Sequence, residues 1–391
     1  MITNMRRSLP LLVIVLALVP VGHAATTIAP AQSQALLRIA GKLSGLPVRR
    51  SVPIVTETSA RYRQRRIAAF NAFYPPAAQL YDDALYAGLG LTSGRGVLAR
   101  TIGASQARPA LYDSRTRKVY LARGKESRQV ILRELVQALQ DQSFDLRRVS
   151  RLGGNRDASF GAYAASLGHA SLVASLLTPK SLASHGGSRL ARFLALQAGF
   201  PSTVGQRFAV TLRNLGGNHA VFSSLRRFPE TTEQIFHVDK FLERERALPI
   251  ALPVEAAGVT LVGDGTFGEL DVRALLATFD VPRLGNAGSG WGGGRSAIYR
   301  AGAREAVVLA LDWDEELDAE EWEEAVRAYV NEAFDAGSPG LPATTPCAAS
   351  ACWDLAGHTV AFERSGIRTA LVLGPDVPTG ARLARTILGL E

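Results

Sequence analysis

The first two thirds of the chain are patterned mainly for helices. Between residues 127 and 141, apolar residues recur at intervals of three and four, which places them on one face of a helix. These residues are Val130, Ile131, Leu135, Ala138 and Leu139. Similar patterns predict helices over residues 158–177, 188–198, 204–215 and 219–225. Gly216, Gly217 and Asn218 predict a break between the last two, and residues 110–122 predict a hairpin.

The pattern changes after residue 253, where short apolar runs alternate with helical stretches. The predicted strands are 296–300, 306–312, 359–364 and 369–373, and the predicted helices are 266–279, 319–334 and 380–388. The glycine-rich stretch from Gly285 to Gly294 predicts a turned or flexible loop. The predicted fold class is α+β, with a mainly helical domain over residues 25–253 and an α+β module over residues 254–391.

Residues 1–24 have the organisation of a secretory signal peptide. Arg6 and Arg7 precede an apolar run from Leu9 to Val21, which is too short to cross a bilayer of roughly 30 Å as a straight helix. The small residues that follow predict cleavage after Ala24. An uncleaved anchor is the alternative. The mature chain has no further segment of transmembrane character, so we expect a secreted or extracytoplasmic protein.

The composition is that of a folded protein with a basic surface. Of the 391 residues, 47% are hydrophobic and 20% are charged, which is sufficient for a core and excludes general disorder. The formal net charge is +9, mostly from arginine, and the basic residues form no run of five or more. The sequence therefore does not indicate nucleic-acid binding. A solvated basic surface is the simpler interpretation, and weak attraction to anionic cell-surface polymers is the functional one.

The chain has two cysteines, Cys347 and Cys352, in a loop rich in Pro, Ala and Ser. An exported chain meets an oxidising environment, so we expect a disulfide between them. Two free thiols are the alternative. Two cysteines alone cannot form a structural zinc site.

One helical segment contains a sequence motif in addition to its helical periodicity. Residues 130–146 read Val-Ile-Leu-Arg-Glu-Leu-Val-Gln-Ala-Leu-Gln-Asp-Gln-Ser-Phe-Asp-Leu. This resembles the active-site helix of a family of secreted bacterial zinc metallopeptidase-like proteins, in which H-E-x-x-H is followed by A-L-Q-D-Q-x-F-D-L. In such a motif two histidines, four residues apart, ligate zinc, and the glutamate between them activates the metal-bound water.

The resemblance implies three zinc-ligand positions, and this chain has a different residue at each. The two histidine positions are Arg133 and Gln137, while the glutamate is retained as Glu134. The family's third ligand is a glutamate on the next helix, in a pattern like E-G-D-A-x-L-V. The matching stretch begins at Leu167, which cannot bind a metal. We expect His169, two residues further on, to point elsewhere on that helix.

Shorter stretches extend the resemblance in order along the chain, over roughly residues 46–334. They are residues 111–114, 205–208, 216–218, 229–237, 265–270 and 291–295. Residues 229–237, Pro-Glu-Thr-Thr-Glu-Gln-Ile-Phe-His, resemble the family pattern P-x-S/T-T-E-Q-x-x-H-P. The resemblance predicts a structural hydrogen bond for His237.

The changed ligands favour a protein without catalytic zinc. Arg133 places a permanent positive charge where a dication would sit. At about 4 Å, two such charges repel by on the order of 4 kcal/mol per unit charge at an effective dielectric constant near 20. Because Arg133 and Glu134 are adjacent on the helix, we expect Arg133 to pair with a carboxylate other than Glu134.

The expected function is therefore non-catalytic. We expect an exported pseudopeptidase that needs no cofactor and has a binding or structural role at the cell envelope or outside the cell. Its partner is unknown. A peptide or another envelope component would suit the former active-site cleft that the resemblance implies. The alternative is a hydrolase with a rebuilt or residual active site around Glu134.

Overall fold

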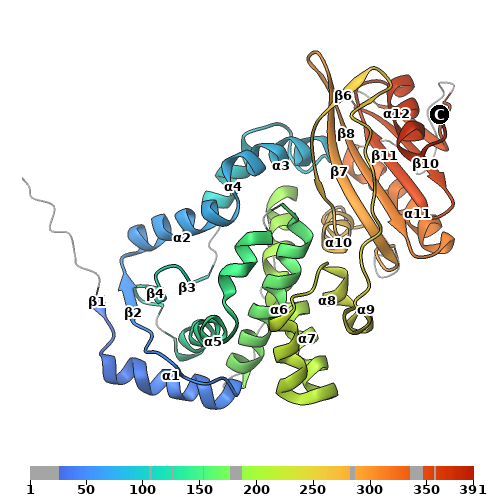
Figure 1. The fold of residues 1–391 in the computed structure, drawn as a ribbon. Coiled ribbons are helices and arrows are strands. Elements are labelled where there is room, and N and C mark those ends of the chain that lie inside the picture. Colours follow the sequence, from blue (N-terminus) through green and yellow to red (C-terminus); the bar gives the residue numbers. More distant parts are fainter. Residues whose placement is uncertain are drawn as a thin grey trace, which may run out of the picture.

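The computed structural model describes most of the chain after the leader. The described residues are 26–104, 108–125, 127–152, 154–176, 187–281, 287–334, 347–355 and 358–391. They form a mostly helical N-terminal part and a C-terminal antiparallel sheet with its own helices (Figure 1). The predicted α+β fold class is confirmed. The predicted signal peptide and the cleavage point after Ala24 lie outside the described residues.

The N-terminal part contains a small sheet surrounded by helices. Its strands are β1 (Thr26–Thr27), β2 (Ile54–Glu57), β3 (Ala110–Asp113) and β4 (Lys118–Ala122), in the order β1-β2-β4-β3. Its helices are α1 (Pro30–Ser44), α2 (Ser59–Phe73), α3 (Pro76–Gly88), α4 (Val97–Ala104), α5 (Arg128–Phe144), α6 (Arg156–Ser175), α7 (Arg189–Arg226), α8 (Glu233–Phe236) and α9 (Val238–Glu243), with a 3-10 turn η1 (Leu146–Leu152). Strands β3 and β4 form the hairpin that the sequence predicts.

Helix α5 is the centre of the N-terminal core. Its apolar residues, among them Leu135 and Leu139, pack against α1, the β2–β4 strands and α6. Helices α6 and α7 then approach each other through glycines. A Cβ atom at Gly205 would lie 2.5 Å from the carbonyl oxygen of Ala164, so a larger residue would push the two helices apart.

Helix α7 runs from Arg189 to Arg226 as one element, although the sequence predicts separate helices there. Pro201 lies inside it without ending it. The predicted break is present as a kink at Gly216 and Gly217, whose backbone angles are not helical. Gly217 has a φ of 59°, a conformation that glycine adopts at no steric cost.

The C-terminal part is a seven-stranded antiparallel sheet in the order β5-β6-β7-β8-β11-β10-β9. The strands are β5 (Glu255–Ala256), β6 (Val259–Thr266), β7 (Trp291–Ala301), β8 (Arg304–Trp313), β9 (Ala351–Leu355), β10 (His358–Ser365) and β11 (Arg368–Leu373). The helices are α10 (Glu269–Thr278), α11 (Glu316–Phe334) and α12 (Val377–Leu388).

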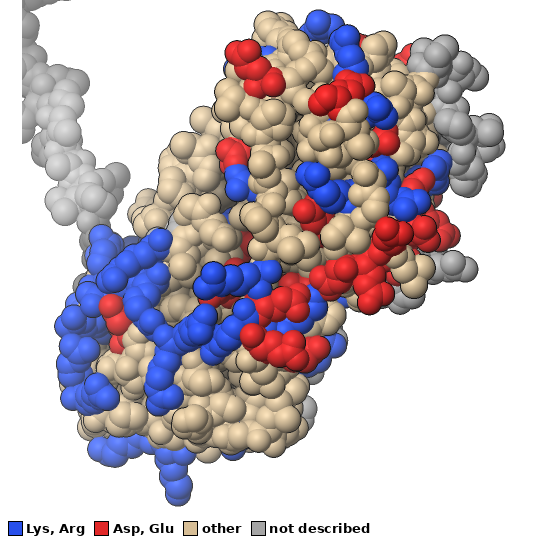
Figure 2. Space-filling model, turned by 45° about the vertical axis from the view of Figure 1, so that its right-hand side comes forward, with Lys and Arg blue, Asp and Glu red and all other residues tan. Residues whose placement is uncertain are grey.

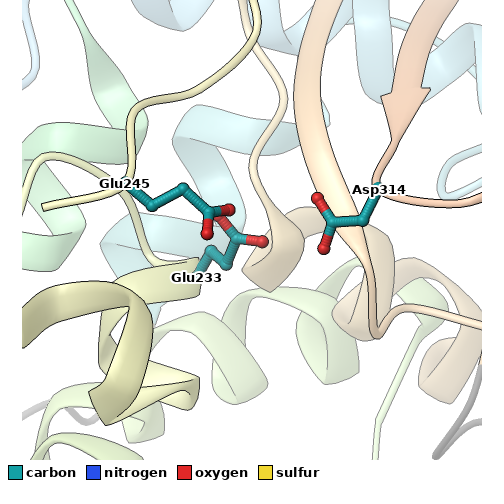
Figure 3. Close-up of side chains that lie close together, drawn as sticks. All are labelled: Glu233, Glu245 and Asp314. Atoms are coloured by element: carbon teal, nitrogen blue, oxygen red, sulfur yellow. The ribbon is translucent and has the colours of Figure 1, made fainter. Parts of the chain in front are cut away.

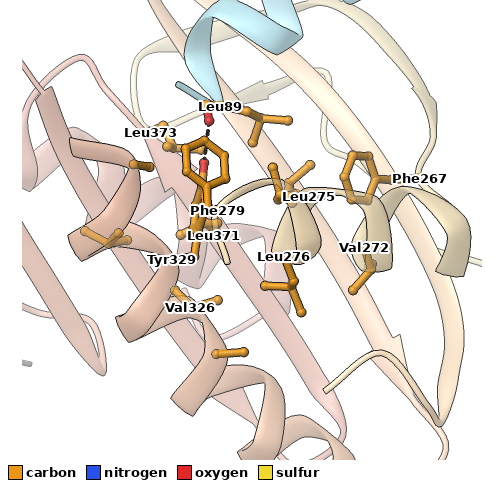
Figure 4. Close-up of a cluster of buried hydrophobic side chains, with 14 of the residues drawn as sticks. Leu89, Phe267, Val272, Leu275, Leu276, Phe279, Val326, Tyr329, Leu371 and Leu373 are labelled. Atoms are coloured by element: carbon orange, nitrogen blue, oxygen red, sulfur yellow. Dashed lines mark hydrogen bonds between the residues drawn. The ribbon is translucent and has the colours of Figure 1, made fainter. Parts of the chain in front are cut away.

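Side chains alternate between the two faces of this sheet, and both faces are buried. Leu309 and Leu371 point to the face that α3, α10 and α11 cover, where the Tyr329 hydroxyl donates a hydrogen bond of 2.8 Å to the carbonyl oxygen of Leu89 (Figure 4). Val308 and Val372 point to the opposite face, which α12 covers. This burial on both faces explains why the strands read as continuous apolar runs.

Two features of the sheet differ from the sequence prediction. Trp291 to Gly294 belong to β7 rather than to a loop, because Gly294 fits closely against Phe267 at the end of β6 and the Trp291 indole donates to the Phe267 carbonyl. Strands β5, β6 and β9 were not predicted. Strand β6 contains two glycines, and pairing with β7 specifies it more than local propensity does.

Cys347 and Cys352 are joined by the predicted disulfide, with their Cα atoms 6.1 Å apart. It ties the segment before β9 to the edge of the sheet, where Cys352 packs under α12 with Val377 and Ala381. Among the helices that the structure describes, none combines the length and apolar character that a membrane span requires.

Candidate functional site

Helix α5 positions Glu134, the candidate catalytic residue. The Ser127 side chain begins the helix by accepting a hydrogen bond from the Val130 amide, and the helix ends at Asp145, which has a left-handed conformation. Glu134 lies in the second turn and is only 1% exposed. We call the positions Arg133, Glu134, Gln137 and Leu167 the vacated centre.

Both oxygens of the Glu134 carboxylate have partners inside the protein. The Arg133 guanidinium contacts Oε1 with its Nε and terminal nitrogen, at 3.0 and 2.9 Å. The Tyr112 amide on β3 donates to Oε2 at 2.9 Å. The prediction that Arg133 pairs with another carboxylate is therefore wrong. The long arginine side chain bends back along its own helix, which spacing arguments based on Cβ positions do not capture.

Aromatic and basic residues from three other elements surround this pair. The hydroxyl of Tyr62, on α2, donates to the carbonyl oxygen of Arg108 at 2.9 Å. Burial raises the pKa of Tyr62, and the nearby charge of Glu134 raises it further, so this phenol is neutral. Arg108 in turn bonds to the hydroxyl of Tyr163 on α6.

The remaining positions of the vacated centre are also buried. Gln137 is 7% exposed, and Leu167 on α6 is completely buried. A guanidinium, an amide and an aliphatic side chain do not form a zinc site, because zinc is held by imidazole, thiolate and carboxylate groups. The residues present therefore do not fit the metal that the resemblance implies.

Polar contacts connect α5 and α6 beside the vacated centre. The Gln140 amide nitrogen donates to the Ser166 carbonyl oxygen at 3.0 Å and lies 2.9 Å from Nδ1 of His169, and the Ser166 hydroxyl donates back to the Gln140 side-chain oxygen. His169 is thus part of the interface between α5 and α6. Its burial lowers its pKa to about 4, so the imidazole is neutral at physiological pH.

A second cluster, which we call the joint, connects the two parts of the chain where α6, α8 and α10 begin. The Asp157 carboxylate accepts hydrogen bonds from the Thr232 hydroxyl (2.5 Å) and amide (3.1 Å). The same Thr232 oxygen accepts from the amide of Leu270. A Cβ atom at Gly268 would overlap the Asp157 carboxylate, so this position requires glycine. Burial raises the pKa of Asp157 to about 7.

His237 belongs to the same joint. Its Nε2 lies 3.0 Å from Oε1 of Glu269, which also accepts from Nε of Arg273 at 2.6 Å. The structural hydrogen bond predicted for His237 is present. The stretches 229–237 and 265–270, which are separate in the sequence, therefore meet in space and hold α8 against α10.

A partly buried arginine completes the joint. Arg156, at the start of α6, pairs with Asp82 of α3 at 3.0 Å and with Asp271 of α10 at 3.2 Å. The Tyr86 hydroxyl accepts a further hydrogen bond from Arg156, and Gln197 donates to Asp271 at 2.6 Å. This network links the four helices α3, α6, α7 and α10 through polar contacts, beside the apolar core that α3, α7 and α10 share.

The carboxylates of Glu233, Glu245 and Asp314 converge beside the joint (Figure 3). Their oxygens lie within 4.8 Å of one another, a spacing that a hard cation could bridge. However, the Lys240 ammonium contacts all three carboxylates, at 2.5 Å from Glu233 and 2.8 Å from Glu245. Burial raises the pKa of Glu233 to about 8 even beside this charge. Lys240 supplies the positive charge that a metal would otherwise provide.

The chain is thus an α+β protein whose candidate site is a buried carboxylate on α5, Glu134, paired with Arg133. A family model described as a domain of unknown function (DUF8575) matches residues 259–384, from β6 into α12. No metallopeptidase family is found among the matches. No curated protein and no solved structure matches the chain.

Sequence reasoning missed three residues that define these sites. Tyr112, Asp157 and Lys240 each provide the decisive partner of a buried carboxylate or hydroxyl. Tyr112 lies in a stretch, residues 111–114, that the resemblance already includes, but its pairing with α5 depends on the tertiary fold. No local pattern distinguishes Asp157 or Lys240 from an ordinary surface residue.

Proposed function

We propose that this protein is an exported, non-catalytic member of a zinc metallopeptidase-like family, with a binding or structural role outside the cytoplasm. The proposal rests on the resemblance of residues 130–146 to an H-E-x-x-H helix. It also rests on the leader-like segment before Ala24 and on the disulfide between Cys347 and Cys352, which suits an oxidising compartment.

The observation that supports a non-catalytic role most directly is the state of Glu134. A general base needs a free oxygen that faces a water molecule. Here Arg133 holds one oxygen and the Tyr112 amide holds the other, in a site that is 1% exposed. The carboxylate stabilises the contact between α5 and β3 and has no remaining face for a substrate.

The alternative function, a hydrolase rebuilt around Glu134, receives less support from the same geometry. Such an enzyme would need a second titratable group facing Glu134. Within the described residues, the groups that approach it are a neutral phenol, Tyr62, and the permanently charged Arg133. Neither exchanges protons near neutral pH.

The test is the zinc content and peptidase activity of the purified protein. We expect no stoichiometric zinc and no hydrolysis of a broad peptide library. The matched variant restores the ligands with Arg133→His, Gln137→His and Leu167→Glu, and we expect it to bind zinc if α5 and α6 keep the inherited geometry. Catalysis need not return, because outer partners that orient zinc ligands have also changed.

Two results would contradict parts of this proposal. One zinc per wild-type chain, with hydrolysis that Glu134→Ala abolishes, would show an active enzyme. Absence of zinc binding by a folded triple variant would instead show that Leu167 is not the third ligand position. The comparison with Leu167→Glu alone separates loss of fold from loss of metal binding.

A further inference from the structure

A cavity of about 450 Å³ opens at the end of α5, two turns beyond Glu134. Five arginines line it: Arg50, Arg117, Arg147, Arg148 and Arg226. They come from four segments, namely the chain before β2, the β3–β4 turn, η1 and the last turn of α7. Such convergence of like charges is unfavourable unless the charges are compensated.

Two of the five arginines have structural partners that account for them. The Arg148 guanidinium donates to the carbonyl oxygens of Phe144 at 2.9 Å and Leu225 at 2.7 Å, and so caps the ends of both α5 and α7. Arg147 pairs with Asp145 at 2.7 Å.

No carboxylate compensates the other three arginines. Within the described residues, the side chains of Arg50, Arg117 and Arg226 form no ion pair, and all three are exposed. The other carboxylate of the cavity, Asp141, already accepts hydrogen bonds from the Tyr112 hydroxyl and the Leu146 amide. Because both donors are neutral, Asp141 keeps its negative charge, and the five arginines and two aspartates of the lining leave a net charge of +3.

Main-chain hydrogen bonds hold Arg50 and Arg117 beside the cavity, and Arg226 lies near an aromatic ring. Gln142 of α5 accepts from the Arg50 amide at 3.0 Å and donates to the Arg50 carbonyl oxygen at 3.1 Å. Arg117 lies in a closed turn, where its amide donates to the Asp113 carbonyl oxygen at 2.7 Å. The Arg226 guanidinium lies 5.8 Å from the ring centre of Phe144, which borders the cavity. The fixed main chain keeps these side chains around one cavity before any ligand binds.

The net charge of the whole chain is also divided unevenly between its two parts. Residues 25–253 contain 32 Lys and Arg against 14 Asp and Glu, a formal net charge of +18, while residues 254–391 contain 10 against 21, a net charge of −11. Figure 2 shows the basic side chains gathered over the N-terminal part and the acidic ones toward the C-terminal part. The basic residues are therefore concentrated in residues 25–253, although they form no long run along the sequence. This field directs anions toward the half that contains the cavity.

We propose that this cavity binds a phosphoryl group, on either a small phosphorylated molecule or a phosphate-bearing polymer. A phosphate monoester carries close to two negative charges and three acceptor oxygens, which match three uncompensated guanidinium groups. A single carboxylate provides one charge and two oxygens, and would leave part of this charge unpaired. The site is separate from the vacated centre and does not depend on whether that centre is catalytic.

The experiment is calorimetric titration of the purified protein at low salt, with inorganic phosphate, pyrophosphate, long-chain polyphosphate and acetate as probes. We expect one phosphate or pyrophosphate site per chain and weaker binding of acetate. Tighter binding of polyphosphate per phosphoryl group than of pyrophosphate would identify a polymer as the source. The double variant Arg117→Gln with Arg226→Gln should weaken phosphate binding by about 100-fold, on the order of tenfold for each guanidinium.

The matched control removes two exposed arginines of the same half, Arg63 and Arg207, which do not line the cavity. Changing both to Gln alters the net charge equally and should change phosphate binding by less than about twofold. An equal loss in both double variants would overturn the proposal, because it would show binding to a diffuse basic surface. Acetate binding as tightly as phosphate would also overturn it, as would no binding of any probe by wild-type protein. The thermal midpoint of each variant checks folding.

Discussion

The vacated centre and the joint are both buried polar clusters, but they are constructed in opposite ways. In the vacated centre one guanidinium, from Arg133, neutralises one carboxylate, from Glu134. In the joint, the polar residues of stretches 229–237 and 265–270 form a dense network between the two parts of the chain. The contrast shows two ways of satisfying buried carboxylates: a single ion pair within one helix, and a network that links several helices.

Arg156 provides the strongest test of the joint. Arg156→Met leaves Asp82 and Asp271 buried without a counter-charge, and we expect it to lower the free energy of unfolding by about 3 to 5 kcal/mol. Urea denaturation measures this. The matched control is Arg192→Met, which breaks the ion pair to the exposed Asp280 between α7 and α10 and should cost about 1 kcal/mol or less. Equal losses of stability in the two variants would show that Arg156 contributes no more than an exposed ion pair does.

The joint should also determine part of the pH dependence of the free energy of unfolding. The pKa of Asp157 rises from 3.8 to about 7 on folding, so folding takes up a proton. Its contribution to stability is complete below pH 3.8 and is lost as the pH rises to about 7, by on the order of 4 kcal/mol. Asp157→Asn should remove this decline, as measured by denaturation at a series of pH values. An unchanged slope would mean that Asp157 is ionised in the folded protein.

The interface beside the vacated centre should respond to pH with the opposite sign. The pKa of His169 falls from 6.5 to about 4 on folding, so protonation favours the unfolded chain. Its contribution to stability is present above pH 6.5 and is lost as the pH falls to about 4, by on the order of 3 kcal/mol. His169→Gln should flatten this acidic limb and leave the Asp157 slope unchanged. If His169→Gln altered stability equally at all pH values, the histidine would contribute by packing alone.

Glu134 tests whether the vacated centre is now structural. Glu134→Gln leaves Arg133, whose side chain is 14% exposed, without a counter-charge. We expect it to lower the free energy of unfolding by about 2 to 3 kcal/mol. The double variant Arg133→Met with Glu134→Gln should recover part of this loss, because no unpaired charge remains. A double-mutant cycle measures the coupling between the two residues. Coupling near zero would contradict the ion pair.

The disulfide should have the smallest effect of these. Changing both Cys347 and Cys352 to Ser should cost about 1 to 2 kcal/mol, because a short loop restricts the unfolded chain little. The loss should appear equally under reducing conditions in the wild-type protein. Loss of the disulfide should leave the coupling energy between Arg133 and Glu134 unchanged, because the two sites are distant. A changed coupling energy would contradict this independence.

Much of the fold followed from local patterns, and the exceptions share a cause. The hairpin at residues 110–122, helix α5 and the strand–strand–helix units after residue 290 have strong periodicity or clear turn residues. Strand β6 and the strand conformation of Trp291 to Gly294 were missed, because glycine-containing segments form strands through pairing with neighbours. The helix through Pro201 was divided in the prediction, since packing of α7 against α6 and α10 outweighs the proline.

The sequence by itself determined the α+β class and the cysteine pair, because both depend on residue type and spacing along the chain. Only the tertiary structure decided which groups satisfy the charges that remain. It placed Arg133 on Glu134, Lys240 among three carboxylates, and uncompensated arginines around one cavity. The physical reason is that a buried charge is stabilised by whatever partner lies within a few ångströms, and long side chains from distant segments supply that partner.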